Sequence, residues 1–101
     1  MQCQMSRKDR EEIINEVSRR SRIRSVFFRS TVTRVIEVVT AKCNDYLEEG
    51  DEFRLACLTV EHWSREQLRK EYGFIWWVAL LEVLLPIVIE LVVEWWLNRQ
   101  P

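Results

Sequence analysis

FIWWVALLEVLLPIVIELVVEWWL, the sequence of residues 74–97, is the stretch that decides how this chain folds. Its only charged residues are Glu82, Glu90 and Glu94. A helix rises 1.5 Å per residue, so this stretch would reach about 36 Å, enough to cross a hydrocarbon core of about 30 Å. The stretch therefore predicts a transmembrane helix at the C-terminal end of the chain.

Paired tryptophans at both ends support this prediction: Trp76 and Trp77 at one end, Trp95 and Trp96 at the other. An indole ring has an apolar body and one N–H group, so it prefers the headgroup level of a bilayer. The four tryptophans are predicted to be membrane-interface anchors.

The positions of the three glutamates indicate what surrounds this helix. At 100° per residue they fall within an arc of about 120°, and Pro86 lies on the same side, where it favours a kink. A carboxylate near the bilayer centre costs about 3 kcal/mol of insertion free energy, so this face should meet something other than lipid. Several copies packed around a common axis would form a homo-oligomeric helical bundle lined by Glu82, Glu90 and Glu94.

Such an acidic lining predicts a cation-conducting or membrane-depolarising pore. Two alternatives stay open for the same residues. The carboxyl groups could instead hold helices together by hydrogen bonds in a structural membrane oligomer, or the stretch could be a helix buried within a protein assembly. Under these alternatives the chain is a scaffolding subunit of a larger assembly, such as a viral particle, without transport activity.

Residues 1–73 are predicted to be helical as well, because the whole chain has only two glycines and two prolines. This assembly region is basic over residues 1–35, with nine basic and four acidic side chains, and acidic over residues 36–73, with five and nine. The fold class is therefore all-α, with amphipathic helices followed by one transmembrane helix and a short tail, residues 98–101.

Capping patterns place the helices within this region. One helix is predicted from Ser6 to Glu49, and a second starts at Asp51 or Glu52 and breaks near Trp63. A third begins after Ser64, whose spacing to Gln67 is that of a capping box, and continues into the apolar stretch. Apolar residues between Phe28 and Leu47, Val35 and Val39 among them, recur at helical spacing and are predicted to form the self-association interface.

Flanking charge predicts the topology. Arg65, Arg69 and Lys70 precede the apolar stretch and only Arg99 follows it, so the positive-inside rule places residues 1–73 in the cytoplasm. The chain is thus predicted to be a single-pass, tail-anchored membrane protein. In its size and its terminal apolar stretch it resembles small phage or bacterial membrane proteins such as holins, although no motif is shared.

A cluster of arginines marks the N-terminal third: Arg19, Arg20, Arg22, Arg24 and Arg29. Guanidinium groups at this density predict contact with anionic lipid headgroups or nucleic-acid phosphates. The alternative is a helix face that pairs with the acidic half of a neighbouring subunit. The predicted partners are therefore a second copy of the chain, a lipid membrane and an anionic lipid or nucleic acid.

Catalysis is not expected from this sequence. Two glycines cannot build a phosphate-binding loop, and the single histidine, His62, has no pair of cysteines or carboxylates at metal-ligand spacing. The three cysteines follow no metal spacing and are predicted to be free thiols. We therefore expect no enzyme, no catalytic residue, no metal, no cofactor and no small-molecule substrate.

Overall fold

A computed structural model describes residues 4–23, 27–73 and 75–99, except for the side chains of residues 75–80. It contains four helices, which confirms the all-α prediction: α1 (Arg7–Ser21), α2 (Phe28–Tyr46), α3 (Phe53–Tyr72) and α4 (Ile75–Arg99).

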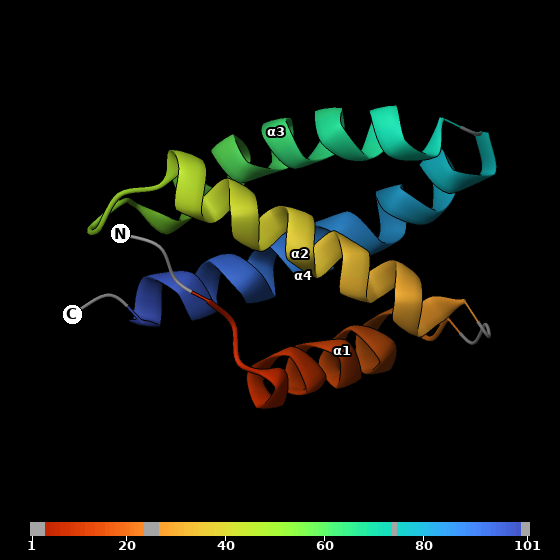
Figure 1. Ribbon diagram of the computed structural model, residues 1–101, viewed down its shortest axis with the longest axis horizontal. Helices are drawn as coiled ribbons and strands as arrows, with labels where there is room; N and C mark the ends of the chain where they lie inside the picture. The colour runs from red at the N-terminus through yellow and green to blue at the C-terminus, as the bar shows by residue number, and fades with distance from the viewer. Residues whose placement is uncertain (1–3, 24–26, 74, 100–101) are drawn as a thin grey trace.

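The four helices form a bundle in which α2 and α4 occupy the middle (Figure 1). Helix α3 packs on both of them from one side and α1 packs on both from the other. Within the described residues α1 and α3 do not touch. The bundle measures 37 × 27 × 19 Å, and the start of α1 lies at the same end of its long axis as the end of α4 (Figure 1).

The N-terminal helix is shorter than predicted. Ser6 caps α1 by accepting a hydrogen bond from the Asp9 backbone N–H at 3.1 Å, as the capping pattern indicates. The helix then ends at Arg22, a non-glycine residue with a φ of 57°. The prediction of one helix from Ser6 to Glu49 is therefore wrong: the chain reverses between α1 and α2, so that both can pack on α4.

Helix α3 is longer than predicted. Its cap is Glu52, whose carboxylate accepts hydrogen bonds from the backbone N–H groups of Arg54 and Leu55. It continues past Trp63 and ends at Gly73, which has a φ of 32°. The predicted break at Ser64 is wrong, because this serine is completely buried in the middle of α3, where its burial outweighs the local capping pattern.

Helix α4 is the core of the bundle. Its apolar side chains are buried against the other three helices: Leu81, Leu84, Leu85, Val88, Ile89, Val92, Val93 and Trp96. Among the described residues, no helix combines the length and the hydropathy needed to cross a bilayer. The predicted transmembrane helix, single-pass location and tail anchor are therefore wrong, and the resemblance to small membrane proteins loses its basis. A helix enclosed by three others is apolar nearly all round for the same reason that a spanning helix is.

The apolar stripe of α2 also has a different role from the one predicted. Val32, Val35 and Val39 are completely buried inside the same chain, in one cluster with the α4 residues. These positions are filled by intramolecular packing, so they cannot also form the predicted interface between copies.

Candidate interaction surface on α3 and α4

The outward face of α4 carries the acidic residues that the sequence brings together. Glu82, Pro86, Glu90 and Glu94 are all exposed. Glu82 pairs with Arg65 of α3, and Glu90 lies 3.8 Å from Arg20 of α1. The pore required a spanning helix, so the proposed pore function is wrong.

Pro86 interrupts the hydrogen-bond ladder of α4 on this same face. A proline has no N–H group to donate to the carbonyl of Glu82, one turn earlier. Both residues are on the exposed side of the helix, where water can satisfy that carbonyl. The missing backbone hydrogen bond therefore lies on the exposed side of α4, where its loss destabilises the helix least.

Two of the predicted interface tryptophans bind other helices. Trp96 is 1% exposed, and its Nε1 donates to Asn44 Oδ1 of α2 at 2.9 Å. Trp95 Nε1 donates to Asp9 Oδ2 of α1 at 2.9 Å. Their indole N–H groups are satisfied within the bundle, so they do not act as membrane-interface anchors. The side chains of Trp76 and Trp77 lie outside the described residues.

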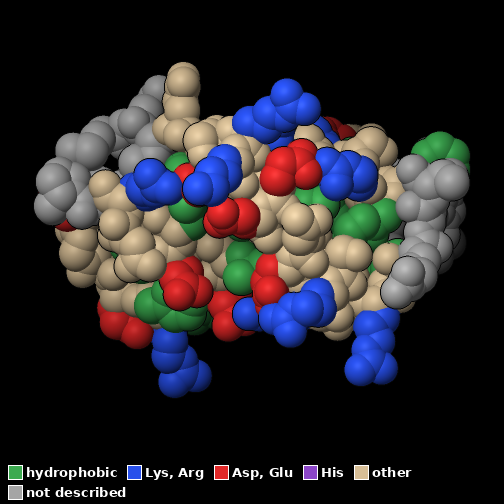
Figure 2. Space-filling view, turned by 90° about the horizontal axis from the view of Figure 1, so that it is seen from below, with side chains coloured by type: hydrophobic (Ala, Val, Ile, Leu, Met, Phe, Trp, Pro, Cys, Tyr) green, Lys and Arg blue, Asp and Glu red, His purple; other side chains and the backbone are tan. Residues whose placement is uncertain are grey.

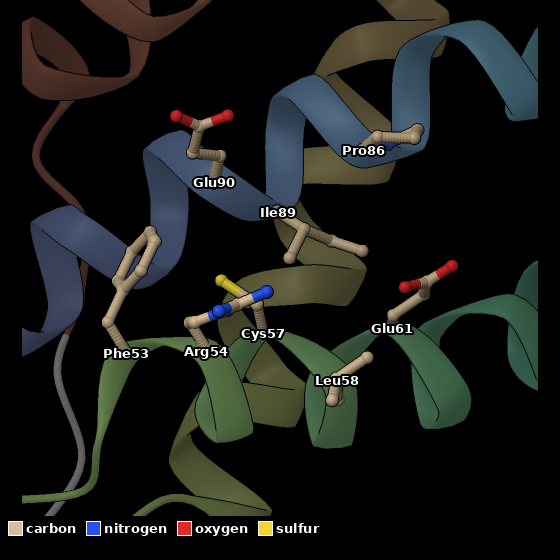
Figure 3. A pocket seen from close by; sticks show the side chains of 8 residues that line it. All are labelled: Phe53, Arg54, Cys57, Leu58, Glu61, Pro86, Ile89 and Glu90. Atoms are coloured by element: carbon tan, nitrogen blue, oxygen red, sulfur yellow. The ribbon is translucent and has the colours of Figure 1, made fainter.

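A groove of about 310 Å³ runs between α3 and α4 (Figure 3). Helix α3 forms one wall and α4 forms the other. The lining combines apolar and charged side chains: Phe53, Arg54, Cys57, Leu58, Glu61, Pro86, Ile89 and Glu90.

The surface beside this groove is unusually apolar. Leu55 is 63% exposed and Leu58 is 62% exposed, because other residues form the buried face of α3. On α4, Val83 is 47% exposed. We define the α3–α4 surface as Leu55, Leu58, Val83 and the groove-lining residues. The sequence analysis missed it, although leucines outside the α3 apolar stripe are a signal for it.

Charged groups of both signs surround these apolar residues. Glu61 accepts a hydrogen bond from Arg65 at 2.9 Å. Arg54 has no ion-pair partner within the part of the chain that the structure describes. Burial raises the pKa of Cys57 to about 11, and the nearby carboxylates of Glu90, Glu52 and Glu61 act in the same direction. At neutral pH the Cys57 thiol is therefore protonated and behaves as a small apolar side chain.

The predicted arginine cluster is part of a mixed surface. Arg19 and Arg20 pair with Glu16, and Arg29 pairs with Glu11. The face that contains α1 shows basic and acidic side chains interspersed (Figure 2). Arg22 ends α1, and Arg24 lies outside the described residues. Contact of this cluster with anionic lipid or nucleic acid stays a prediction.

Asp9 connects α1 to the end of α4, a role that the sequence analysis did not find. The hydrogen bond from Trp95 is the largest influence on this carboxylate and lowers its pKa, and Arg99 and Ser6 lower it further, whereas burial opposes them. A lowered pKa in the folded state means that Asp9 stabilises the fold above its unfolded pKa. That stabilisation is lost as the pH falls through the folded pKa.

We therefore expect Asp9→Asn to lower the free energy of unfolding by about 1.5–3 kcal/mol at pH 7, the range for hydrogen bonds to a charged group. The difference between parent and variant should shrink as the pH is lowered from about 5 towards 2, because the parent loses its carboxylate charge. Urea unfolding at a series of pH values measures this. A difference that stays constant across that range would show that the charge of Asp9 contributes nothing.

Comparison of the chain with protein-family models, with curated proteins and with solved structures finds no match.

Proposed function

We propose that this chain is a non-enzymatic assembly protein that self-associates through the α3–α4 surface. The observation that carries the proposal is the exposure of Leu55 and Leu58, each more than 60%, beside an open groove. Contiguous exposed apolar residues on a small domain are typical of a protein-interaction surface.

The composition of the α3–α4 surface favours a second copy as the partner. Its rim contains both Arg54 and Glu61, so two copies can present opposite charges to each other. A standard interface buries about 800 Å² on each partner. The chain has an accessible surface of 6582 Å², so such an interface would cover about an eighth of it.

The chemistry of the groove supports a role in binding. Its thiol, Cys57, has a raised pKa and lacks nucleophilic thiolate at neutral pH. Glu61 is held by Arg65, and Glu90 lies near Arg20, so both carboxylates face cations. Both carboxylates are thus engaged in ion pairs, and the protonated thiol is a poor nucleophile, which favours a binding role over catalysis.

Leu58→Glu tests the proposal. We expect the parent to be a dimer at micromolar concentration by sedimentation velocity. The variant should be monomeric, because each copy would place a carboxylate in the apolar centre of the interface. Its far-UV circular dichroism should match the parent, because Leu58 is 62% exposed in the single chain.

Phe27→Glu is the matched control. Phe27 is 71% exposed and precedes α2, at the opposite end of the bundle from the start of α3 (Figure 1). It should leave the dimer intact. A parent that is monomeric up to about 1 mM, or a Leu58→Glu variant that dimerises as well as the parent, would overturn the proposed surface.

A further inference from the structure

We propose that two copies pair α3 against α3 in an antiparallel arrangement, with a two-fold axis between Cys57 and Leu58. Arg54 of each copy then pairs with Glu61 of the partner subunit. This inference rests on the proposed self-association and specifies its geometry.

The first step is the placement of three residues on one side of α3. Arg54, Leu58 and Glu61 follow one another at spacings of four and three residues, which brings them to one helix face. All three line the groove between α3 and α4 (Figure 3). A partner helix that covers this groove therefore meets all three.

The second step is the symmetry of the charges about Leu58. The midpoint between positions 54 and 61 falls between positions 57 and 58. A two-fold axis that crosses the helix at this point reverses the partner and places its position 61 opposite position 54. The two positions are about 10 Å apart along the helix, so two equivalent ion pairs would enclose the central leucines.

The third step is the comparison with the parallel arrangement. Two parallel α3 helices in register would place Arg54 against Arg54 of the partner subunit and Glu61 against Glu61 of the partner subunit. Like charges in contact oppose association, whereas the antiparallel arrangement replaces both repulsions by attractions. Rim charge therefore selects the antiparallel pair.

The two side chains that would form these ion pairs can each accept a further partner. Glu61 uses its Oε1 to accept from Arg65, and a carboxylate can accept several hydrogen bonds through its two oxygens. Arg54 has no ion-pair partner in the described part of its own chain. Leu58 lies near the axis and meets Leu58 of the partner subunit, which buries two side chains that are each exposed in the single chain.

Charge reversal tests the pairing. Arg54→Glu and Glu61→Arg should each weaken the dimer at least tenfold, because each creates two like-charge contacts. The double variant Arg54→Glu/Glu61→Arg restores opposite charges and should dimerise within about threefold of the parent. Dissociation constants are measured by sedimentation equilibrium, and circular dichroism verifies that every variant is folded.

Disulfide cross-linking tests the position of the axis. In a Cys3→Ser/Cys57→Ser background, Leu58→Cys should give a covalent dimer on mild oxidation, because the two positions face each other across the axis. Leu55→Cys is the matched control. Two copies of position 55 would be offset by about 7 Å along the helices in addition to the separation of the helix axes, which is too far for a disulfide.

The outcomes separate this inference from the proposed function. A monomeric parent overturns both. A dimeric parent whose double charge reversal stays weakened, or whose Leu55→Cys variant cross-links in place of Leu58→Cys, overturns the antiparallel pairing alone.

Discussion

Replacing Val39 by aspartate is expected to unfold the chain at 25 °C. Val39 is completely buried in α2, in the cluster that α2 shares with α4. A carboxylate at this position would be buried without a cation, which costs several kcal/mol and approaches the whole stability of a small domain. Far-UV circular dichroism at pH 7 should show the loss of most of the helical signal.

Ala41→Asp is the control for this variant. Ala41 is exposed on the same helix, so the introduced carboxylate stays in water and the cost is the loss of helix propensity, about 0.5–1 kcal/mol. A folded Val39→Asp variant that merely dissociates into monomers would place Val39 at an interface between copies and contradict the observed packing.

Trp96→Ala is expected to give the second-largest effect, a loss of about 3–5 kcal/mol in the free energy of unfolding. The indole is 1% exposed, and its removal leaves a cavity between α4 and α2. Trp96→Phe should cost less, because the ring space stays filled while Asn44 loses the indole N–H donor. Urea unfolding monitored by circular dichroism measures both changes.

Trp63→Ala provides the comparison, since this tryptophan is 38% exposed and stacks on Tyr46 with ring centroids 4.7 Å apart. Its removal should cost clearly less than the removal of Trp96. If Trp96→Ala leaves the unfolding transition unchanged, the C-terminal half of α4 does not pack in the bundle.

The helical nature of the chain could be predicted from the sequence, and so could the grouping of Glu82, Pro86, Glu90 and Glu94 on one face of one helix. Both follow from local rules: few glycines and prolines, and a fixed rotation of 100° per residue. The surroundings of that face could not be predicted. The interior of a protein and the interior of a bilayer both select apolar side chains, so a helix covered by α1, α2 and α3 has a sequence like that of a spanning helix.

The predicted helix boundaries were wrong for a similar reason. Ser64 has the spacing of a capping residue, but tertiary packing holds it inside α3. The end of α1 is also hard to predict from the sequence. Arg22, which is not a glycine, adopts the positive φ there, so neither a glycine nor a proline marks this position. The α3–α4 surface was missed because the exposure of Leu55 and Leu58 depends on where α4 lies, which no local pattern specifies.

The central claim is that α4 folds as the core of one bundle with α2, and native-state hydrogen exchange tests it most directly. Amide exchange of residues 32–43 in α2 and 81–96 in α4 is followed at increasing, sub-denaturing urea concentrations. We predict that the two segments are the most protected and lose protection together, with the same opening free energy and the same dependence on urea. If α4 keeps its protection after α2 has opened, or opens while α2 stays protected, the two helices do not share a core and the claim is contradicted.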